Sequence, residues 1–318
     1  RRARNLVKAM GMDEARIDHQ KRRLGWLAAF GLALVDRTLI DALGRHLGLP
    51  FAAALRANAY GFEPWRIAAD LAGLDAVAFL GGLAPLPRVA ARHTVGLIDP
   101  LDASDRPSDA PDDGLPVTLE EVVDAYGHDH FKLKVRGDVD ADLARLVRIS
   151  AILDRKVGRY RCTLDGNEQF ADVTSVAALI ERMVAEPALA GLMRGLMFIE
   201  QPITRSEALA TPLGALGEKV PVIIDESDAE DHALLDALRL GYRGVSSKAC
   251  KGVWRALINK ARLGAVPGGI LSGEDLTTQA GLGVQQDLAL VSALGIGHVE
   301  RLDHCHDPLA HVGIGRAD

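Results

Sequence analysis

The sequence predicts an α/β fold in which a parallel sheet closes into a barrel. From about residue 94, short apolar or β-branched runs alternate with amphipathic helical stretches. Neighbouring runs begin roughly 23–36 residues apart, the length of a βα unit. About eight such runs are present, a number that closes into a (β/α)8-type barrel. A doubly wound sheet is the alternative, but no Gly-x-Gly-x-x-Gly follows the first run, which weakens a dinucleotide-binding interpretation.

A long helix is expected ahead of the barrel, over residues 13–48. Apolar residues recur there at spacings of three and four, which predicts one apolar face. That face comprises Ala28, Leu32, Val35, Leu39, Ile40, Leu43 and Leu47. Gly48 and Pro50 end the helix. Segment 51–92 has no clear pattern, and residues 100–116, rich in Asp, Pro and Ser, are expected to form a loop.

The barrel elements follow from the alternation of apolar runs and amphipathic stretches. Strands are expected at residues 94–98, 130–135, 160–164, 196–199, 220–224, 243–247, 269–272 and 298–301. The clearest helices between them are expected at residues 140–153, 173–183, 231–240, 253–263 and 281–294.

Composition narrows the classes of protein. The chain has 318 residues, of which 48% are hydrophobic and 25% charged, an ordinary globular composition that excludes disorder and a disulfide scaffold. The net charge of −6 and the aromatic content of 4% argue against a nucleic-acid partner. The longest uncharged apolar run, 24–35, is shorter than the ~20 residues of a membrane helix. Three scattered cysteines match no zinc motif, and we expect reduced thiols in a cytoplasmic protein.

Acidic residues follow three consecutive expected strands, at the strand ends where barrel enzymes place their chemistry. They are Asp165, Glu200 and the pair Asp225–Glu226. Three carboxylates at one rim would repel one another unless a cation lay between them, and oxygen ligands of this kind suit Mg²⁺. The sequence therefore indicates a magnesium site at this end of the barrel.

Lysines lie on the strands to either side of these acids. Lys132 and Lys134 are two positions apart on one strand, so both side chains point to the same side, and Lys248 follows strand 243–247. Repulsion between like charges and burial would both lower a lysine pKa and make one lysine a usable base. An edge strand with two solvated lysines is the alternative.

The order of these residues resembles that of the enolase superfamily, in the branch of the muconate lactonizing enzyme and mandelate racemase. The likeness runs from about residue 25 to about residue 306. Its motifs are Lys132-Leu133-Lys134, Asp165-Gly166-Asn167, Glu200-Gln201-Pro202, Asp225-Glu226-Ser227, and Lys248 with Lys251-Gly252.

The resemblance implies a modified TIM barrel, (β/α)7β, with an α+β capping domain. We expect the barrel at residues 93–300, the remainder of the capping domain at 1–92, and a C-terminal segment at 301–318 that returns to it. Family members normally carry a three-stranded sheet before the helix predicted at 13–48. That sheet has no counterpart here, so the capping domain is expected to be incomplete.

The resemblance also implies a cofactor, one Mg²⁺ per subunit held by Asp165, Glu200 and Asp225. Glu226 is the alternative ligand after the fifth strand. The family's common step is removal of the proton α to a carboxylate, which gives an enediolate. Racemization or epimerization, dehydration and cycloisomerization of a small carboxylate substrate all stay open.

In this interpretation Lys132 adds positive charge near the substrate oxygens. Lys134 and Lys248 would be the acid or base on opposite faces of the substrate. A catalytically silent member that binds a carboxylate ligand is an alternative. A metal-dependent hydrolase would need His-rich ligands, which the strand ends lack.

Four further residues are weaker candidates for substrate or supporting contacts. Asn167 trails the third-strand acid, and Glu274 follows the seventh strand, either as a site residue or as part of a rim turn. His304 and His306 are expected to line the pocket or to pack locally. Barrels of this kind are often homo-oligomers, although the sequence shows no interface.

Overall fold

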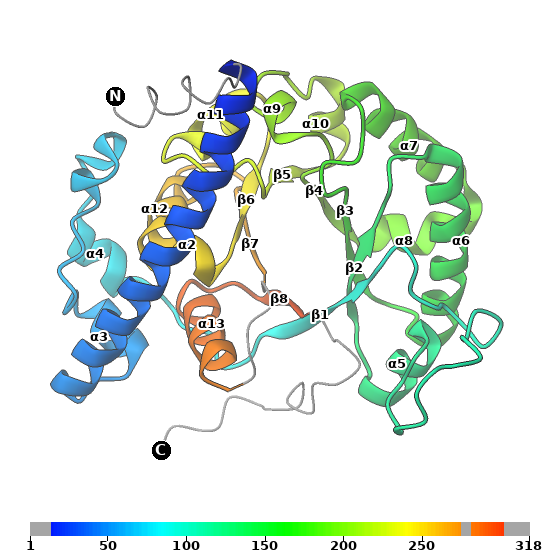
Figure 1. Cartoon of the computed structure of the whole chain (residues 1–318), viewed down its shortest axis with the longest axis horizontal. Coiled ribbons are helices and arrows are strands. Elements are labelled where there is room, and N and C mark those ends of the chain that lie inside the picture. The colour runs from blue at the N-terminus through cyan, green and yellow to red at the C-terminus, as the bar shows by residue number, and fades with distance from the viewer. Residues whose placement is uncertain (1–13, 275–280, 302–318) are drawn as a thin grey trace.

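The computed structural model describes residues 14–274 and 281–301, with side chains for 30–274 and 281–300. Eight parallel strands form a closed barrel in which each strand pairs with the next along the chain and β8 pairs with β1 (Figure 1). The strands are β1 (Ala90–Val95), β2 (His130–Lys134), β3 (Arg161–Asp165), β4 (Leu196–Glu200), β5 (Val222–Ile224), β6 (Gly244–Ser247), β7 (Ile270–Gly273) and β8 (His298–Arg301). The predicted barrel is confirmed, and the doubly wound alternative is wrong.

A helix follows each of the first seven strands and packs on the outside of the barrel, so the part of the chain that the structure describes has a (β/α)7β arrangement (Figure 1). These helices are α5 (Leu119–Tyr126), α6 (Val139–Lys156), α7 (Val173–Ala185), α8 (Ala190–Gly195), α9 (Arg205–Ala208), α10 (Ala215–Lys219), α11 (Ala233–Arg239), α12 (Val253–Gly264) and α13 (Leu282–Ala293). Three-residue 3₁₀ turns lie before α8 (η3, Pro187–Leu189) and before α12 (η4, Ala249–Lys251).

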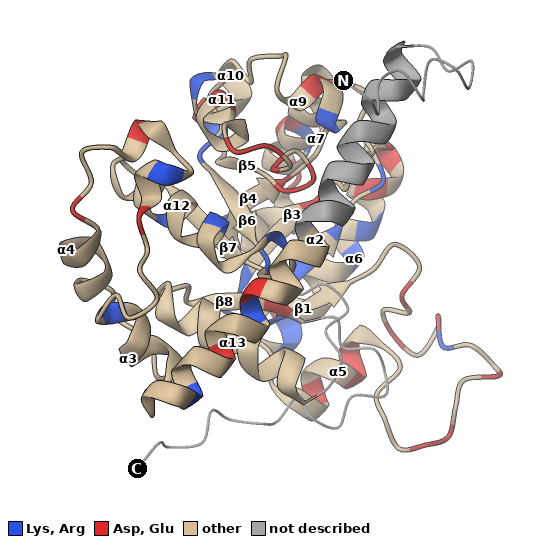
Figure 2. Cartoon of the chain, turned by 60° about the vertical axis from the view of Figure 1, so that its left-hand side comes forward, with Lys and Arg blue, Asp and Glu red and all other residues tan. Residues whose placement is uncertain are grey.

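The predicted boundaries differ most at the first strand, which spans Ala90–Val95 rather than 94–98. The predicted loop at 100–116 is confirmed, and its charged residues are mainly acidic (Figure 2). Helix α5, which the sequence analysis did not predict, follows this loop. Its start is fixed by a capping box in which Thr118 and Glu121 satisfy each other's backbone N–H groups.

Within the described residues, three helices precede the barrel: α2 (Glu14–Leu47), α3 (Phe51–Arg56) and α4 (Ala76–Gly81), with the 3₁₀ turns η1 (Pro64–Arg66) and η2 (Ala69–Leu71) between the last two. Helix α2 runs beside α12 and η4 (Figure 1). Among the described helices, none combines the length and hydropathy that a membrane span requires.

The predicted apolar face of the first helix is only partly correct. Ile40 is buried, but Leu39 is 62% exposed, and most of the other predicted positions are exposed too. The buried stripe of α2 contains Ala33, Ile40 and Gly44 instead. Small residues allow the helix axis to approach η4 and α12 closely, so packing selects this stripe rather than the one with most leucines.

Two apolar clusters hold the fold together. The larger lies between the strands and helices α5–α8, α10 and α11, and the smaller joins α2–α4 to α12 and α13. The barrel interior, in contrast, holds buried polar side chains: Arg92, Lys132, Thr163, Glu200, Ser246, Ser272 and Glu300. Buried charges require partners, and these charges meet at one end of the barrel.

Candidate metal and acid–base site

Asp165 ends β3 and is almost fully buried, at 1% exposure. The backbone after Asp165 passes close to Pro202, since a Cβ atom on Gly166 would lie 2.5 Å from the Cα of Pro202. Only a glycine permits this approach between the turns that follow β3 and β4. The turn also places Asn167, whose φ is +39°, so that its amide nitrogen donates a hydrogen bond to Glu226 at 3.2 Å.

Glu200 ends β4 and is fully buried, and the residue after it links this strand to the next. The side-chain oxygen of Gln201 accepts hydrogen bonds from the backbone N–H of Asp225 at 2.8 Å and of Ser227 at 3.1 Å. Its amide nitrogen donates to the Ser227 hydroxyl at 2.9 Å. Gln201 therefore fixes where the chain carries Asp225 after β5.

Asp225 is held from two sides by lysines of the turn that follows β6. Lys248 Nζ lies 2.6 Å from Asp225 Oδ2, and Lys251 Nζ lies 3.0 Å from Asp225 Oδ1. Lys251 also donates to the backbone carbonyls of Asp225 and Ser246 at 2.8 and 3.0 Å. Lys251 belongs to one of the sequence motifs, but the sequence did not predict its contact with Asp225.

Lys132 occupies the centre of the buried charges. It is 1% exposed, and its ammonium lies between four carboxylates contributed by β3, β4, β8 and the residue after β7. The Nζ–oxygen distances are 2.8 Å to Asp165, 2.9 Å to Glu200, 2.8 Å to Glu274 and 2.8 Å to Glu300. Lys132 therefore neutralises the carboxylate cluster from within the barrel.

Lys134 lies on the same side of β2 as Lys132, as the alternation along the strand predicted, but closer to the rim, with 20% of its side chain exposed. Its Nζ donates to Asp165 Oδ2 at 2.5 Å and to Asn167 Oδ1 at 2.6 Å. Lys248, which follows β6, contacts Asp225 and also lies 2.6 Å from Glu274 Oε2. Because β2 and β6 are four strands apart in a closed barrel of eight, Lys134 and Lys248 approach the cluster from opposite sides.

Carboxylates decide the charge states of the buried lysines. Burial alone would lower the pKa of Lys132, but Asp165, Glu200 and Glu300 outweigh burial and raise the pKa well above its usual value. The pKa of Lys248 is likewise raised, because Asp225 outweighs burial. The prediction that burial and like charge lower the pKa of the lysine pair is wrong for Lys132, since it took no account of four acidic neighbours.

The carboxyl groups divide into those that lysines hold ionised and those that burial tends to protonate. Burial opposes ionisation of Asp165 and Asp225, yet the lysines beside them lower the pKa of both groups. Burial raises the pKa of Glu200, and burial together with Asp225 and Asp165 raises the pKa of Glu226 to about 7. Glu226 thus differs in character from the adjacent Asp225.

Three carboxylates lie close enough together to hold one metal ion. One oxygen each from Glu200, Asp225 and Glu274 lies within 4.8 Å of the others, and all three residues are buried. Buried carboxylate oxygens are the ligands that Mg²⁺ prefers. Asp165 is not in this set, because its carboxylate is turned toward Lys132 and Lys134. The role of Asp165 as a metal ligand stays a prediction. Glu274, in contrast, lies among the buried charges at the centre of the site rather than in a peripheral rim turn.

Two buried residues of the site were missed in the sequence. Glu300 contacts Lys132 and accepts a hydrogen bond from the Thr94 hydroxyl at 2.7 Å. Arg92 is fully buried beneath the cluster and donates to Ser272 Oγ at 3.1 Å. The alternation of residues on β8 offered a signal for Glu300, whereas the inward orientation of Arg92 depends on the register of β1.

The remaining candidates His304 and His306 lie outside the described residues. Positions of Lys, Arg, Asp and Glu lie along and after the barrel strands (Figure 2), and their charged groups meet in the ion pairs given above. The structure therefore brings the other predicted site residues together at one end of the barrel. They are the lysines Lys132, Lys134 and Lys248, the acids Asp165, Glu200 and Asp225, and the weaker candidates Asn167, Glu226 and Glu274.

Comparison with known proteins identifies the family of the chain. Residues 115–293 match the family model described as enolase C-terminal domain-like. A similar solved structure is a mandelate racemase/muconate lactonizing protein from Paracoccus denitrificans complexed with magnesium, with 20% identity and a TM-score of 0.60, covering 92% of this chain and 68% of that one. No curated protein matches the chain.

Two further structures are similar at the level of the fold. The L-Ala-D/L-Glu epimerase of Bacillus subtilis is 19% identical with a TM-score of 0.51, and the alignment covers 74% of this chain and 62% of that one. Muconate cycloisomerase of Pseudomonas fluorescens is 21% identical with a TM-score of 0.51, and the alignment covers 78% and 66%. The chain thus spans less than two thirds of the length of the epimerase. Since the family model matches more than half of the chain, the protein belongs to the enolase superfamily, in the group of mandelate racemase and muconate lactonizing enzymes.

Proposed function

We propose that the protein removes the proton α to the carboxylate of a small substrate with the help of one Mg²⁺ per subunit. The observation that carries this proposal is the placement of Lys134 and Lys248, which approach one buried carboxylate cluster from opposite sides of the barrel. Two ammonium groups so placed are suited to act on opposite faces of one substrate carbon. Racemization or epimerization, dehydration and cycloisomerization are the reaction outcomes of this step.

The residues at the centre fit the proposed metal. Glu200 Oε2 and Asp225 Oδ1 are buried and have no hydrogen-bond partner within the described residues, although Lys132 and Lys251 lie at ion-pair distance. A hard cation would complete the coordination of these oxygens. We assign Glu200, Asp225 and either Asp165 or Glu274 as its protein ligands. The bound ion would supply Lewis-acid stabilisation of the charge that develops on the substrate carboxylate.

Each lysine then has a distinct part in the reaction. Lys134 is reached from the barrel rim, and its Nζ can accept the substrate proton once it is neutral. Lys248 lies on the opposite side, where its protonated form, favoured by Asp225, can deliver a proton and its neutral form can remove one from the other enantiomer. Lys132 is enclosed by four carboxylates, so we assign it a fixed positive charge rather than proton transfer.

The helices that precede the barrel also fit the family, as part of its capping domain. We propose that helices α2–α4 are the remainder of a capping domain, because α2 packs beside η4, the turn that directly follows Lys248, while α3 contacts α2 and α4 contacts α3. The barrel would then hold the chemistry and the capping segments the contacts to the rest of the substrate. We expect the protein to act in the cytoplasm on small carboxylates, and homo-oligomers are common for such barrels.

Exchange of a substrate α-proton with solvent tests the function directly. The purified protein is incubated with Mg²⁺ in D₂O and a panel of hydroxy acids, sugar acids and N-acyl amino acids, and deuterium at the α-carbon is measured by NMR. We expect exchange with at least one acid, and its loss in Lys134→Ala combined with Lys248→Ala. Exchange that survives the double variant would contradict the mechanism. Mg²⁺-dependent binding of an acid without exchange would indicate the catalytically silent alternative.

A further inference from the structure

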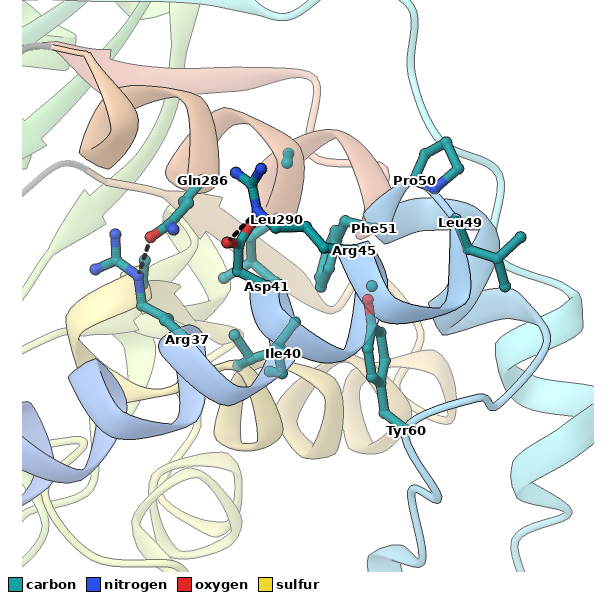
Figure 3. Close-up of a pocket in the computed structure, with 15 residues that line it drawn as sticks. Arg37, Ile40, Asp41, Arg45, Leu49, Pro50, Phe51, Tyr60, Gln286 and Leu290 are labelled. Atoms are coloured by element: carbon teal, nitrogen blue, oxygen red, sulfur yellow. Dashed lines mark hydrogen bonds and ion pairs between the residues drawn. The ribbon is translucent and has the colours of Figure 1, made fainter.

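A cavity of about 420 Å³ lies outside the barrel, between α2, the start of α3, and helices α12 and α13 (Figure 3). None of the lysines or carboxylates of the charged centre lines it. Its floor includes Ala249, the residue after Lys248, so the turn η4 separates the cavity from the charged centre. The cavity is therefore a second site, distinct from the one proposed for catalysis.

The walls of the cavity are apolar and are built from four separate elements. Ile40, Leu49, Phe51, Val253 and Leu290 supply the apolar surface. Small residues keep the space open: a Cβ atom on Gly44 would lie 3.3 Å from the hydroxyl oxygen of Tyr60 and 3.3 Å from the carbonyl oxygen of Leu49. A cavity of this size with apolar walls and a few polar groups is typical of a small-molecule site.

Polar groups gather at one edge of the cavity. Arg37 Nε donates to Gln286 Oε1 at 2.9 Å, and Arg45 Nε donates to Asp41 Oδ2 at 2.7 Å (Figure 3). Both bonds use Nε and so orient the guanidinium groups without engaging their terminal nitrogens. With two arginines and one aspartate, this edge is net positive, which favours an anion.

Tyr60, which lines the cavity (Figure 3), supplies a third polar group, and its hydroxyl oxygen lies beside Gly44. Within the described residues this hydroxyl has no hydrogen-bond partner. A ligand that enters the cavity can therefore gain a hydrogen bond at its inner end without breaking an existing one.

We propose that this cavity binds a small molecule with an apolar body and a single anionic group, the body lying between Ile40, Phe51 and Leu290 and the anion at the edge formed by Arg37 and Arg45. The apolar walls would remove the body from water, and the guanidinium groups would hold the anion. The inference does not rest on the proposed function, because the two sites share no residue.

Naphthoate, which combines a flat apolar body with one carboxylate, is the probe for isothermal titration calorimetry. We expect saturable binding that persists when the metal is chelated and when Lys134 is replaced by Met. Ala289→Trp, which fills the cavity from α13, is expected to weaken binding at least about tenfold. Ala42→Trp is the matched control, because Ala42 is an exposed residue of α2 that does not line the cavity.

A second pair of variants tests the anionic contact and does not depend on filling the cavity. Arg37→Met combined with Arg45→Met is expected to weaken binding of naphthoate about tenfold while leaving that of neutral naphthalenemethanol unchanged. Binding that survives Ala289→Trp, or an absence of saturable binding, would overturn the proposal. It would also be overturned if Ala289→Trp instead dissociated a dimer of the chain, because the occupant would then be a second copy.

Discussion

Lys132 Nζ lies 2.8 Å from Glu300 Oε2, a contact that joins β2 to β8 through the interior of the barrel. Glu300 is 3% exposed, and its other oxygen accepts a hydrogen bond from Thr94 on β1. The contact is therefore both buried and fully hydrogen-bonded, in contrast to the ion pairs on the outer helices. It anchors the lysine at the centre of the carboxylate cluster.

We expect Glu300→Gln to lower the free energy of unfolding by about 2 kcal/mol, below the usual cost of breaking a buried pair because three carboxylates still hold Lys132. Urea denaturation measures the change. Glu181→Gln is the control, since its pair with Lys219 is exposed and its removal should have no measurable effect. A Glu300→Gln variant as stable as the original chain would show that this buried pair contributes nothing net.

Binding of Mg²⁺ is expected to raise the melting temperature. An ion that binds the folded state alone stabilises it by about 2.7 kcal/mol at one hundred times its dissociation constant. Differential scanning fluorimetry with and without EDTA measures this shift. Glu200→Gln should abolish it, because it replaces a buried, negatively charged carboxylate by a neutral amide, whereas Glu207→Gln on the exposed surface of α9 should not. An equal shift in Glu200→Gln would place the ion elsewhere.

The strand-end residues were predictable because their signal is local. Asp165, Glu200 and Asp225 each follow an apolar run, and the parallel strands of a barrel bring such positions to one rim. The position of Glu300 beside Lys132 is not local in this sense. It depends on the closure of the sheet, in which β8 pairs with β1, and on the register that turns alternate side chains inward.

Helix α2 shows another limit of sequence patterns. Periodicity located the helix to within one residue at each end but not the stripe that packs, because its apolar residues cover more than one face. Ala33 and Gly44 are weak signals of burial by hydropathy, yet both are buried in the helix that packs against η4, where a side chain on Gly44 would crowd the Tyr60 hydroxyl. Which stripe is buried depends on the shape of the partner surface, which a single helix does not encode.

Replacing the lysines one at a time should separate the two faces of the substrate. Lys134→Met is expected to abolish exchange of the α-proton in one enantiomer and to leave exchange in the other within about tenfold, and Lys248→Met to do the reverse. Loss of a general base costs about 10²–10⁴ in rate. NMR of each enantiomer in D₂O measures both rates. If both variants lose the same enantiomer, the lysines do not act on opposite faces.

His298 makes stability depend on pH. Burial, with Arg92 and His130 nearby, lowers the pKa of His298 to about 3, and its Nδ1 lies 2.7 Å from a terminal nitrogen of Arg92. The ring is thus neutral in the folded chain and accepts that hydrogen bond. In the unfolded chain its pKa is about 6.5, so the unfolded state takes up a proton first as the pH falls. The contribution of neutral His298 to the free energy of unfolding is fully present above pH 6.5, and it is lost as the pH falls from about 6.5 toward 3. Between pH 7.5 and 5 the loss of stability amounts to about 2 kcal/mol, at about 1.4 kcal/mol per pH unit below 6.5.

Urea denaturation at a series of pH values measures the loss. His298→Gln, whose amide oxygen can accept the same hydrogen bond, should remove this part of the pH dependence. His232→Gln, at an exposed histidine, should leave it in place. An unchanged pH dependence in His298→Gln would show that the ring titrates alike in both states.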